Sequence, residues 1–172
     1  YSTEKKTSND IKDEITDEVN SIISKGDRPP HLAAVIVGND GASLTYVGSK
    51  VRACEKVGFD STLVSLEDSI SEEELLDKVY ELNNDKKIDG YIVQLPLPEH
   101  IDTQKVLLAV DPKKDVDGFH PVNFGRMALN LPTFISATPN GIMELLKRYE
   151  VPTEGKNTIV IGRSDIVGKP VS

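Results

Sequence analysis

Four polar side chains have the types and spacing needed to hold a flat, nitrogen-rich ligand and to move a proton on it. Tyr46 and Lys50 are four residues apart, which places them on one face of a helix. An aromatic ring beside an amine suits a planar heteroaromatic molecule. The neutral amide of Gln94 could hydrogen-bond the lysine amine without fixing its protonation state. Asp117 could accept two N–H donors from a guanidine-like ring edge.

Each of these residues also has a structural interpretation. A half-buried tyrosine beside a lysine whose stem covers apolar surface has the same spacing as Tyr46 and Lys50. Gln94 could cap a strand by bonding loop backbone groups, and Asp117 could lie in a solvated turn. Spacing by itself leaves both interpretations open.

The remaining polar residues do not predict a metal site. Asp115 and Asp117 are neighbours in the sequence, but lysines precede them and no histidine is placed to join them. No ligand-like spacing connects the three histidines, His31, His100 and His120. Cys54 lies on the apolar stripe of its predicted helix, which indicates a buried, inert thiol.

A second group of residues has the placement of a dinucleotide-phosphate loop. It follows an apolar run and precedes a predicted helix, and it reads Gly162-Arg163-Ser164-x-x-Val167-Gly168. Glycines there permit close approach of a phosphate, and a helix N-terminus attracts anionic oxygens. The pattern departs from G-x-G-x-x-G at the second glycine and in its spacing, so alone it is weak support for nucleotide binding.

Alternating strand and helix patterns position these residues. Apolar runs predict strands at Leu32–Val37, Ser61–Leu66, Gly90–Gln94 and Thr158–Ile161. Helices are predicted from Ser8 to Gly26, from Ser43 to Gly58, from a Ser71/Glu74 capping box to Asn83, after an Asp102 cap, and from Pro139 to about Tyr149. Residues 119–138 have poor periodicity and predict no element.

This alternation predicts an α/β fold, with a three-layer domain built on a mostly parallel sheet and then the start of a Rossmann-like domain. Ligands bind beyond the carboxyl ends of parallel strands, so Lys50, Gln94 and Asp117 are expected to meet at that edge. The run Thr158–Ile161 has no predicted neighbour, and we therefore expect the chain to be part of a longer protein.

Composition excludes several classes of protein. The 172 residues include 20 Lys+Arg and 28 Asp+Glu, a formal net charge of −8, which argues against binding nucleic acid or an anionic membrane. The single cysteine, the lack of an apolar run near 18 residues and the absence of a signal-peptide pattern predict a soluble, cytoplasmic protein.

Four motifs together resemble the bifunctional methylenetetrahydrofolate dehydrogenase/cyclohydrolase family. In order, they are Tyr46-x-x-x-Lys50, Val93-Gln94-Leu95-Pro96-Leu97-Pro98, Lys114-Asp115-Val116-Asp117-Gly118-Phe119 and Gly162-Arg163-Ser164-x-x-Val167-Gly168-x-Pro170. The resemblance covers almost the whole chain. The glutamate-rich segment 72–83 is a further family feature, and Tyr91 stands where an aliphatic residue is usual. The combination of the four motifs favours the functional interpretation of each residue.

The resemblance implies NADP-dependent oxidation of 5,10-methylenetetrahydrofolate and hydrolysis of 5,10-methenyltetrahydrofolate to the 10-formyl form. Lys50 would handle the proton, Tyr46 would stack on the folate and help to place Lys50, and Gln94 would hydrogen-bond Lys50. Asp117 would bind the aminopyrimidine edge of the pterin, and Pro96 would line the folate site. NADP, rather than NAD, would be held by Gly162, Arg163, Ser164, Val167 and Gly168.

The resemblance also implies a homodimer that acts on tetrahydrofolate derivatives. Residues 1–138 would form the folate-binding catalytic domain, and residues 139–172 would begin the NAD(P)-binding domain. Two alternatives are a folate-binding module without redox chemistry and a generic dinucleotide-binding domain, because the family's dinucleotide domain continues beyond this sequence.

Overall fold

The computed structural model describes residues 2–39 and 41–171, and the chain divides into two compact units. The first unit is Tyr1–Lys114 and the second is Asp115–Ser172. The predicted domain boundary after residue 138 stays a prediction. Among the described residues, no helix combines the length and the apolar character that crossing a bilayer would require.

The first unit is built on a three-stranded parallel sheet, which confirms the predicted fold class. Its strands are β1 (His31–Val37), β2 (Asp60–Leu66) and β3 (Gly90–Val93), in the order β2-β1-β3. The three predicted strands of this unit are thus confirmed to within one residue at each end. Residues 33–37 of the central strand are buried, because the strand is covered on both faces.

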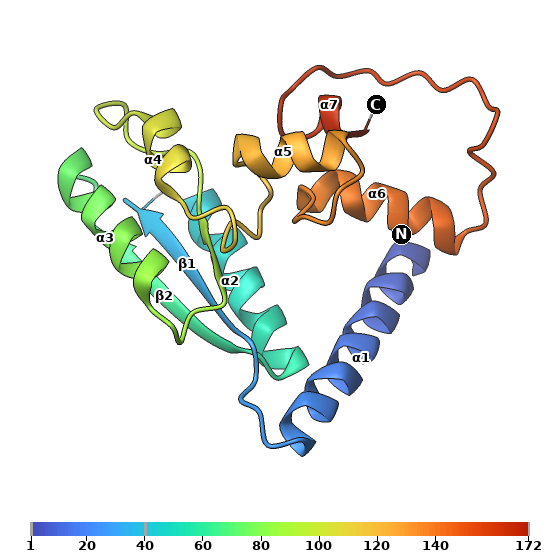
Figure 1. Ribbon diagram of the computed structural model, residues 1–172, viewed down its shortest axis with the longest axis horizontal. Helices are drawn as coiled ribbons and strands as arrows, with labels where there is room; N and C mark the ends of the chain where they lie inside the picture. The colour runs from blue at the N-terminus through green and yellow to red at the C-terminus, as the bar shows by residue number, and fades with distance from the viewer. Residues whose placement is uncertain (1, 40, 172) are drawn as a thin grey trace. The chain divides into compact units, whose positions relative to one another are not determined.

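Helices cover both faces of this sheet, which gives three layers (Figure 1). On one face, Val35 packs in a core with Leu75 and Val79 of α3 (Glu72–Asn84) and Val106 of α4 (Thr103–Ala109). On the other face lies α2 (Gly41–Val57), which contacts β1 and β2, and α1 (Ser2–Ser24) packs on α2. The alternation of side chains along β1 supplies both cores.

Of three helix starts predicted from capping residues, two are confirmed and one is wrong. The Ser71 hydroxyl accepts from the Glu74 N–H and the Glu74 carboxylate accepts from the Ser71 N–H, which confirms the predicted capping box. Asp102 caps α4 by accepting from the Lys105 N–H (3.2 Å). The prediction that Ser43 caps α2 is wrong, because the helix begins at Gly41 and Ser43 is buried in its first turn.

Helices are the regular elements of the second unit in its described residues, and long loops connect them. It contains α5 (Pro121–Ala128), α6 (Ala137–Arg148) and the single turn α7 (Gly168–Val171). The predicted helix through Pro139 is confirmed as α6, whereas α5 lies in the segment that predicted no element. The predicted strand Thr158–Ile161 is wrong: its residues form no strand, and the Ile161 side chain is 99% exposed. A parallel strand needs a neighbour, and residues 115–171 contain no other strand.

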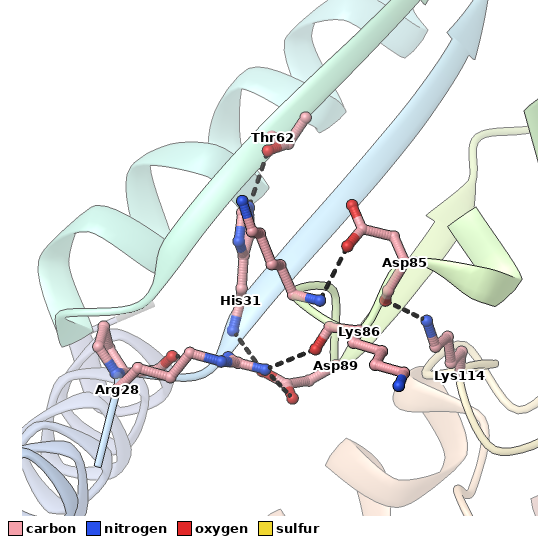
Figure 2. A network of polar contacts seen from close by, with 9 residues as sticks. Arg28, His31, Thr62, Asp85, Lys86, Asp89 and Lys114 are labelled. Atoms are coloured by element: carbon pink, nitrogen blue, oxygen red, sulfur yellow. Dashed lines mark hydrogen bonds and ion pairs between the residues drawn. The ribbon is translucent and has the colours of Figure 1, made fainter. Parts of the chain in front are cut away.

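A network of polar contacts ties the amino ends of the strands together (Figure 2). The Arg28 guanidinium makes two hydrogen bonds to the Asp89 carboxylate, at 2.7 and 2.9 Å. Asp89 also accepts from the His31 N–H (2.8 Å), and the His31 ring bonds the Thr62 hydroxyl (2.8 Å). These contacts join the start of β1 to β2 and β3, and they help to align the strands that end at the carboxyl edge.

Acid is expected to weaken this network. The Arg28 guanidinium lowers the pKa of the Asp89 carboxyl, against the opposing effect of burial. An aspartate whose pKa is lowered on folding stabilises the fold above its unfolded pKa of about 3.9, and the contribution is lost as the pH falls through the folded value. Asp89→Asn should therefore lower the free energy of unfolding at pH 7 by less than about 1 kcal/mol, since water screens this half-exposed pair.

Urea unfolding between about pH 3 and pH 7 measures this effect. The stability difference between Asp89→Asn and the parent should shrink below about pH 4. Asp77→Asn, at an exposed position on α3, is the control and should show no such trend. A difference for Asp89→Asn that is constant with pH would contradict the expectation.

Candidate active site

Tyr46 and Lys50 share an exposed face of α2. The helix begins at Gly41, shortly after β1 ends, so its first half adjoins the carboxyl edge of the sheet. Val47 is buried and fixes the rotation of the helix, which leaves the Tyr46 side chain 66% exposed and Lys50 exposed as well. An aromatic face and an amine are therefore both accessible to a ligand.

Cys54 lies further along α2. It is half-buried, whereas the sequence predicts a buried thiol. Burial is the main cause that raises the pKa of its thiol. A thiol with a raised pKa is a poor nucleophile at neutral pH. The prediction of an inert cysteine therefore agrees with its surroundings.

Gln94 follows β3 directly at the carboxyl edge. Its backbone N–H donates to the Val35 carbonyl (2.8 Å), so it is held beside β1. Its side-chain Nε2 donates to the Leu95 carbonyl (2.7 Å), which is the capping role described as its structural interpretation. The Leu95–Pro96 peptide is cis, and Pro96 is exposed where the chain leaves the sheet. Gln94 thus has a fixed backbone position at the end of the strand.

Three of the four predicted polar site residues lie on elements that adjoin one edge of the first unit. Tyr46 and Lys50 come from α2 and Gln94 from the end of β3. Asp117 belongs to the second unit. Its convergence with the other three stays a prediction.

The loop that carries Asp117 is organised by the buried carboxylate of Asp115. Asp115 accepts from the backbone N–H of Phe119 (3.3 Å) and of His120 (2.8 Å), and from the Asn123 side chain (2.8 Å). Both Asp115 and Asn123 are more than nine-tenths buried. The sequence indicates only a poor metal ligand at Asp115. It does not indicate this role, because the partner Asn123 lies in a segment without clear periodicity.

Gly118 closes the same loop against another part of the second unit. Its φ of +68° lies in the left-handed region that favours glycine. A Cβ at this position would lie 2.6 Å from the Ser136 backbone nitrogen and 2.8 Å from the Ile135 carbonyl carbon. Only glycine therefore permits this approach, and the turn after Asp117 is closely defined.

The predicted phosphate-loop residues form one tight turn. The Ser164 hydroxyl accepts from the backbone N–H of Val167 (3.2 Å) and of Gly168 (3.1 Å). A Cβ on Gly168 would lie 2.6 Å from the Arg163 nitrogen and from the Gly162 carbonyl carbon, so these backbones pack directly on one another. The exposed Arg163 side chain supplies the positive charge that a phosphate requires. Because the Val167 and Gly168 N–H groups donate to Ser164, the Arg163 guanidinium is the donor in this turn that could face a dinucleotide phosphate.

Acidic, histidine and cysteine side chains do not gather into a metal site in the part of the chain that the structure describes. No group of three or more of them could hold an ion there.

Known protein families match most of the chain. Residues 3–117 match the catalytic domain of tetrahydrofolate dehydrogenase/cyclohydrolase, and residues 136–172 match its NAD(P)-binding domain. Bifunctional protein FolD of Flavobacterium johnsoniae is 70% identical over 168 residues, which are 98% of this chain and 57% of that protein. The same protein of Porphyromonas gingivalis is 62% identical, with the same shares covered. The chain thus spans a little over half the length of these relatives.

Solved structures show the same fold. The bifunctional FolD enzyme of Campylobacter jejuni superposes with a TM-score of 0.94 at 44% identity, over 98% of this chain and 60% of that one. The Trypanosoma brucei methylenetetrahydrofolate dehydrogenase-cyclohydrolase, solved with NADP cofactor and inhibitor, superposes with a TM-score of 0.91 at 35% identity, over 96% of this chain and 57% of that one. The similarity extends across both units.

Proposed function

The chain belongs to the tetrahydrofolate dehydrogenase/cyclohydrolase family, and on this premise we propose that it interconverts 5,10-methylene-, 5,10-methenyl- and 10-formyltetrahydrofolate. The reactions are an NADP-dependent oxidation and a hydrolysis. One observation supports this most: Tyr46 and Lys50 share an exposed face of α2 at the sheet edge where Gln94 follows β3. An amine, an amide and an aromatic face are the groups that this chemistry needs.

Lys50 is the proposed proton-handling residue of the hydrolysis. Water adds to the bridge carbon of the methenyl cation, and the added oxygen loses both of its protons as the formyl C=O forms. N5 gains one proton as its bond to that carbon breaks, so one proton is released overall. The Lys50 amine can accept and return such protons. Gln94 is proposed to hydrogen-bond and orient the amine, because an amide offers both a donor and an acceptor.

The other site residues are proposed to hold the substrate. The Tyr46 ring stacks on the flat folate and helps to place Lys50, and Pro96 lines the site. The Asp117 carboxylate accepts two N–H bonds from the aminopyrimidine edge of the pterin. Stacking combined with a two-point polar contact fixes both the plane and the rotation of the ligand, which is the orientation that catalysis requires.

Residues of the second unit are proposed to hold NADP. Arg163 would face a phosphate beside the close-packed turn that Gly162, Ser164, Val167 and Gly168 form. When bound, NADP⁺ supplies the hydride acceptor for oxidation of the methylene group. Residues 1–138 would then be the folate domain and residues 139–172 the beginning of the nucleotide domain, in a cytoplasmic homodimer.

Binding of 5-formyltetrahydrofolate, a stable folate, tests the substrate assignment. Asp117→Ala should weaken this binding by about 10–100-fold, because it removes two hydrogen bonds to a charged acceptor. Isothermal titration measures the affinity. Asp77→Ala removes the same charge from an exposed position on α3 and should leave the affinity unchanged. Equal affinities for Asp117→Ala and the parent would rule out the proposed pterin anchor.

A second candidate function is a folate-binding module without redox activity. The observation that favours it is the lack of any strand in residues 115–171, since nucleotide-binding folds of this type are built on a sheet. Titration with NADP⁺ and an assay of NADPH formation distinguish the two. Folate binding with neither NADP⁺ binding nor turnover would favour the module.

A further inference from the structure

The chain reaches the Asp117 loop through a polar cluster at the end of α3, centred on Asn83. The Oδ1 atom of Asn83 accepts hydrogen bonds from the Tyr91 hydroxyl (2.7 Å) and from the Asp111 backbone N–H (2.8 Å). Its Nδ2 atom donates to the Ala109 carbonyl (2.8 Å). The single amide of Asn83 therefore joins α3 to β3 and to the end of α4.

Lys114 also hydrogen-bonds the end of α3. Its Nζ atom donates to the carbonyls of Leu82 and Asp85, at 2.7 Å each, where α3 ends. Carbonyls in the last turn of a helix lack partners within the helix, so the amine satisfies them. The Lys114 carbonyl in turn accepts from the Tyr91 backbone N–H (2.9 Å). Tyr91, which is buried in the core, thus holds the cluster with both its hydroxyl and its backbone.

These contacts restrict the path of residues 109–114. Ala109, Asp111 and Lys114 each have a backbone group bonded to α3 or β3, and the Lys114 N–H also donates to the Asp111 carbonyl (2.8 Å). Asp117 follows three residues after Lys114, a reach of about 10 Å at most. The contacts of residues 109–114 therefore determine where the chain enters the loop that carries Asp117.

We propose that Asn83 is a positioning residue for the Asp117 carboxylate, and that the Tyr91 hydroxyl orients the Asn83 amide. The inference rests on the proposed function, in which Asp117 anchors the pterin. Asn83 acts only through the backbone path that leads to this anchor. An amide suits the position because its nitrogen donates to the Ala109 carbonyl while its oxygen accepts two bonds, a combination that a carboxylate does not offer.

A double-mutant cycle tests this role by titration with 5-formyltetrahydrofolate. Asn83→Ala should weaken binding about tenfold in the parent protein. In the Asp117→Ala background the same substitution should change the affinity by less than about twofold, because the anchor that it positions is already absent. Asn84→Ala is the matched control: the Asn84 amide donates to the Tyr80 carbonyl of its own helix, and its removal should leave the affinity unchanged.

Tyr91→Phe provides a second variant in case Asn83→Ala does not fold. It keeps the buried ring and removes only the hydroxyl, and it should weaken folate binding by about threefold while Asp117 is present and not in its absence. A purely structural role for the cluster predicts losses that multiply with that of Asp117→Ala, and this result would overturn the proposal.

The outcomes also separate this proposal from the proposed function. Folate binding that depends on Asp117 but not on Asn83 or Tyr91 would overturn the positioning role alone. No binding of 5-formyltetrahydrofolate by the parent protein would overturn the proposed function, and the positioning role with it. Thermal unfolding of every variant, followed in parallel, shows whether a loss of affinity has a separate cause in unfolding.

Discussion

Replacing Lys50 by methionine is expected to slow the hydrolysis of 5,10-methenyltetrahydrofolate by about 10²–10⁴-fold, the usual contribution of general acid–base catalysis. Methionine keeps most of the apolar stem and removes the amine. Because Lys50 is exposed on α2, the free energy of unfolding should change by less than about 0.5 kcal/mol. Hydrolysis is measured as the loss of the absorbance of the methenyl form, and stability is measured by urea titration.

Two further variants separate proton transfer from charge. Lys50→Arg keeps the positive charge, but a guanidinium does not release its proton at neutral pH, so hydrolysis should remain close to that of Lys50→Met. Lys56→Met removes an amine from the same helix and should retain nearly full activity. A fully active Lys50→Arg would show that Lys50 contributes charge alone, and unchanged hydrolysis in Lys50→Met would end its catalytic assignment.

Replacing Asp115 by alanine is expected to lower the free energy of unfolding by about 3–5 kcal/mol. The substitution removes a buried carboxylate that accepts three hydrogen bonds. It leaves the His120 N–H and the buried Asn123 amide without this partner, and each unsatisfied donor costs about 1–3 kcal/mol. Urea unfolding measures the total, and hydrogen exchange at residues 118–124 shows whether the loss is local.

Two other substitutions in the same loop serve as comparisons for Asp115→Ala. Asp115→Asn keeps the shape and one accepting oxygen, so it should cost about half as much as Asp115→Ala. Asp117→Ala should affect folate affinity far more than stability, because the proposed role of Asp117 is to bind the ligand. A loss below about 1 kcal/mol in Asp115→Ala would mean that the loop does not depend on this carboxylate.

Most of the first unit follows from local sequence patterns. The continuous apolar run at residues 32–37 predicts the central strand, because a strand covered on both faces has no solvent-facing position. The Ser71/Glu74 pair and Asp102 predict helix starts, because a cap satisfies backbone donors within its own turn. Each of these signals lies within a few residues of the structure that it determines.

The second unit shows where such patterns fail. Residues 158–161 have the composition of a buried strand, yet they form none, because a strand is completed only by a neighbour to which it can hydrogen-bond. The sequence does not indicate the start of helix α5, because its cap is His120, whose ring accepts from the Val122 N–H (3.1 Å), and histidine is not a usual capping residue. Pro121, at the first helical position, is typical of a helix start.

The sequence by itself determined the family, the α/β class and the residues proposed to do the chemistry, because motif order and apolar periodicity are properties of the chain that need no coordinates. The tertiary structure alone decided the hydrogen-bond partners of Asp115 and Asn83. Asp115 meets Asn123 and Asn83 meets Tyr91 and Asp111 only after the chain has folded. A polar side chain stabilises a loop through groups brought to it by other elements, and their identity depends on packing rather than on neighbouring sequence.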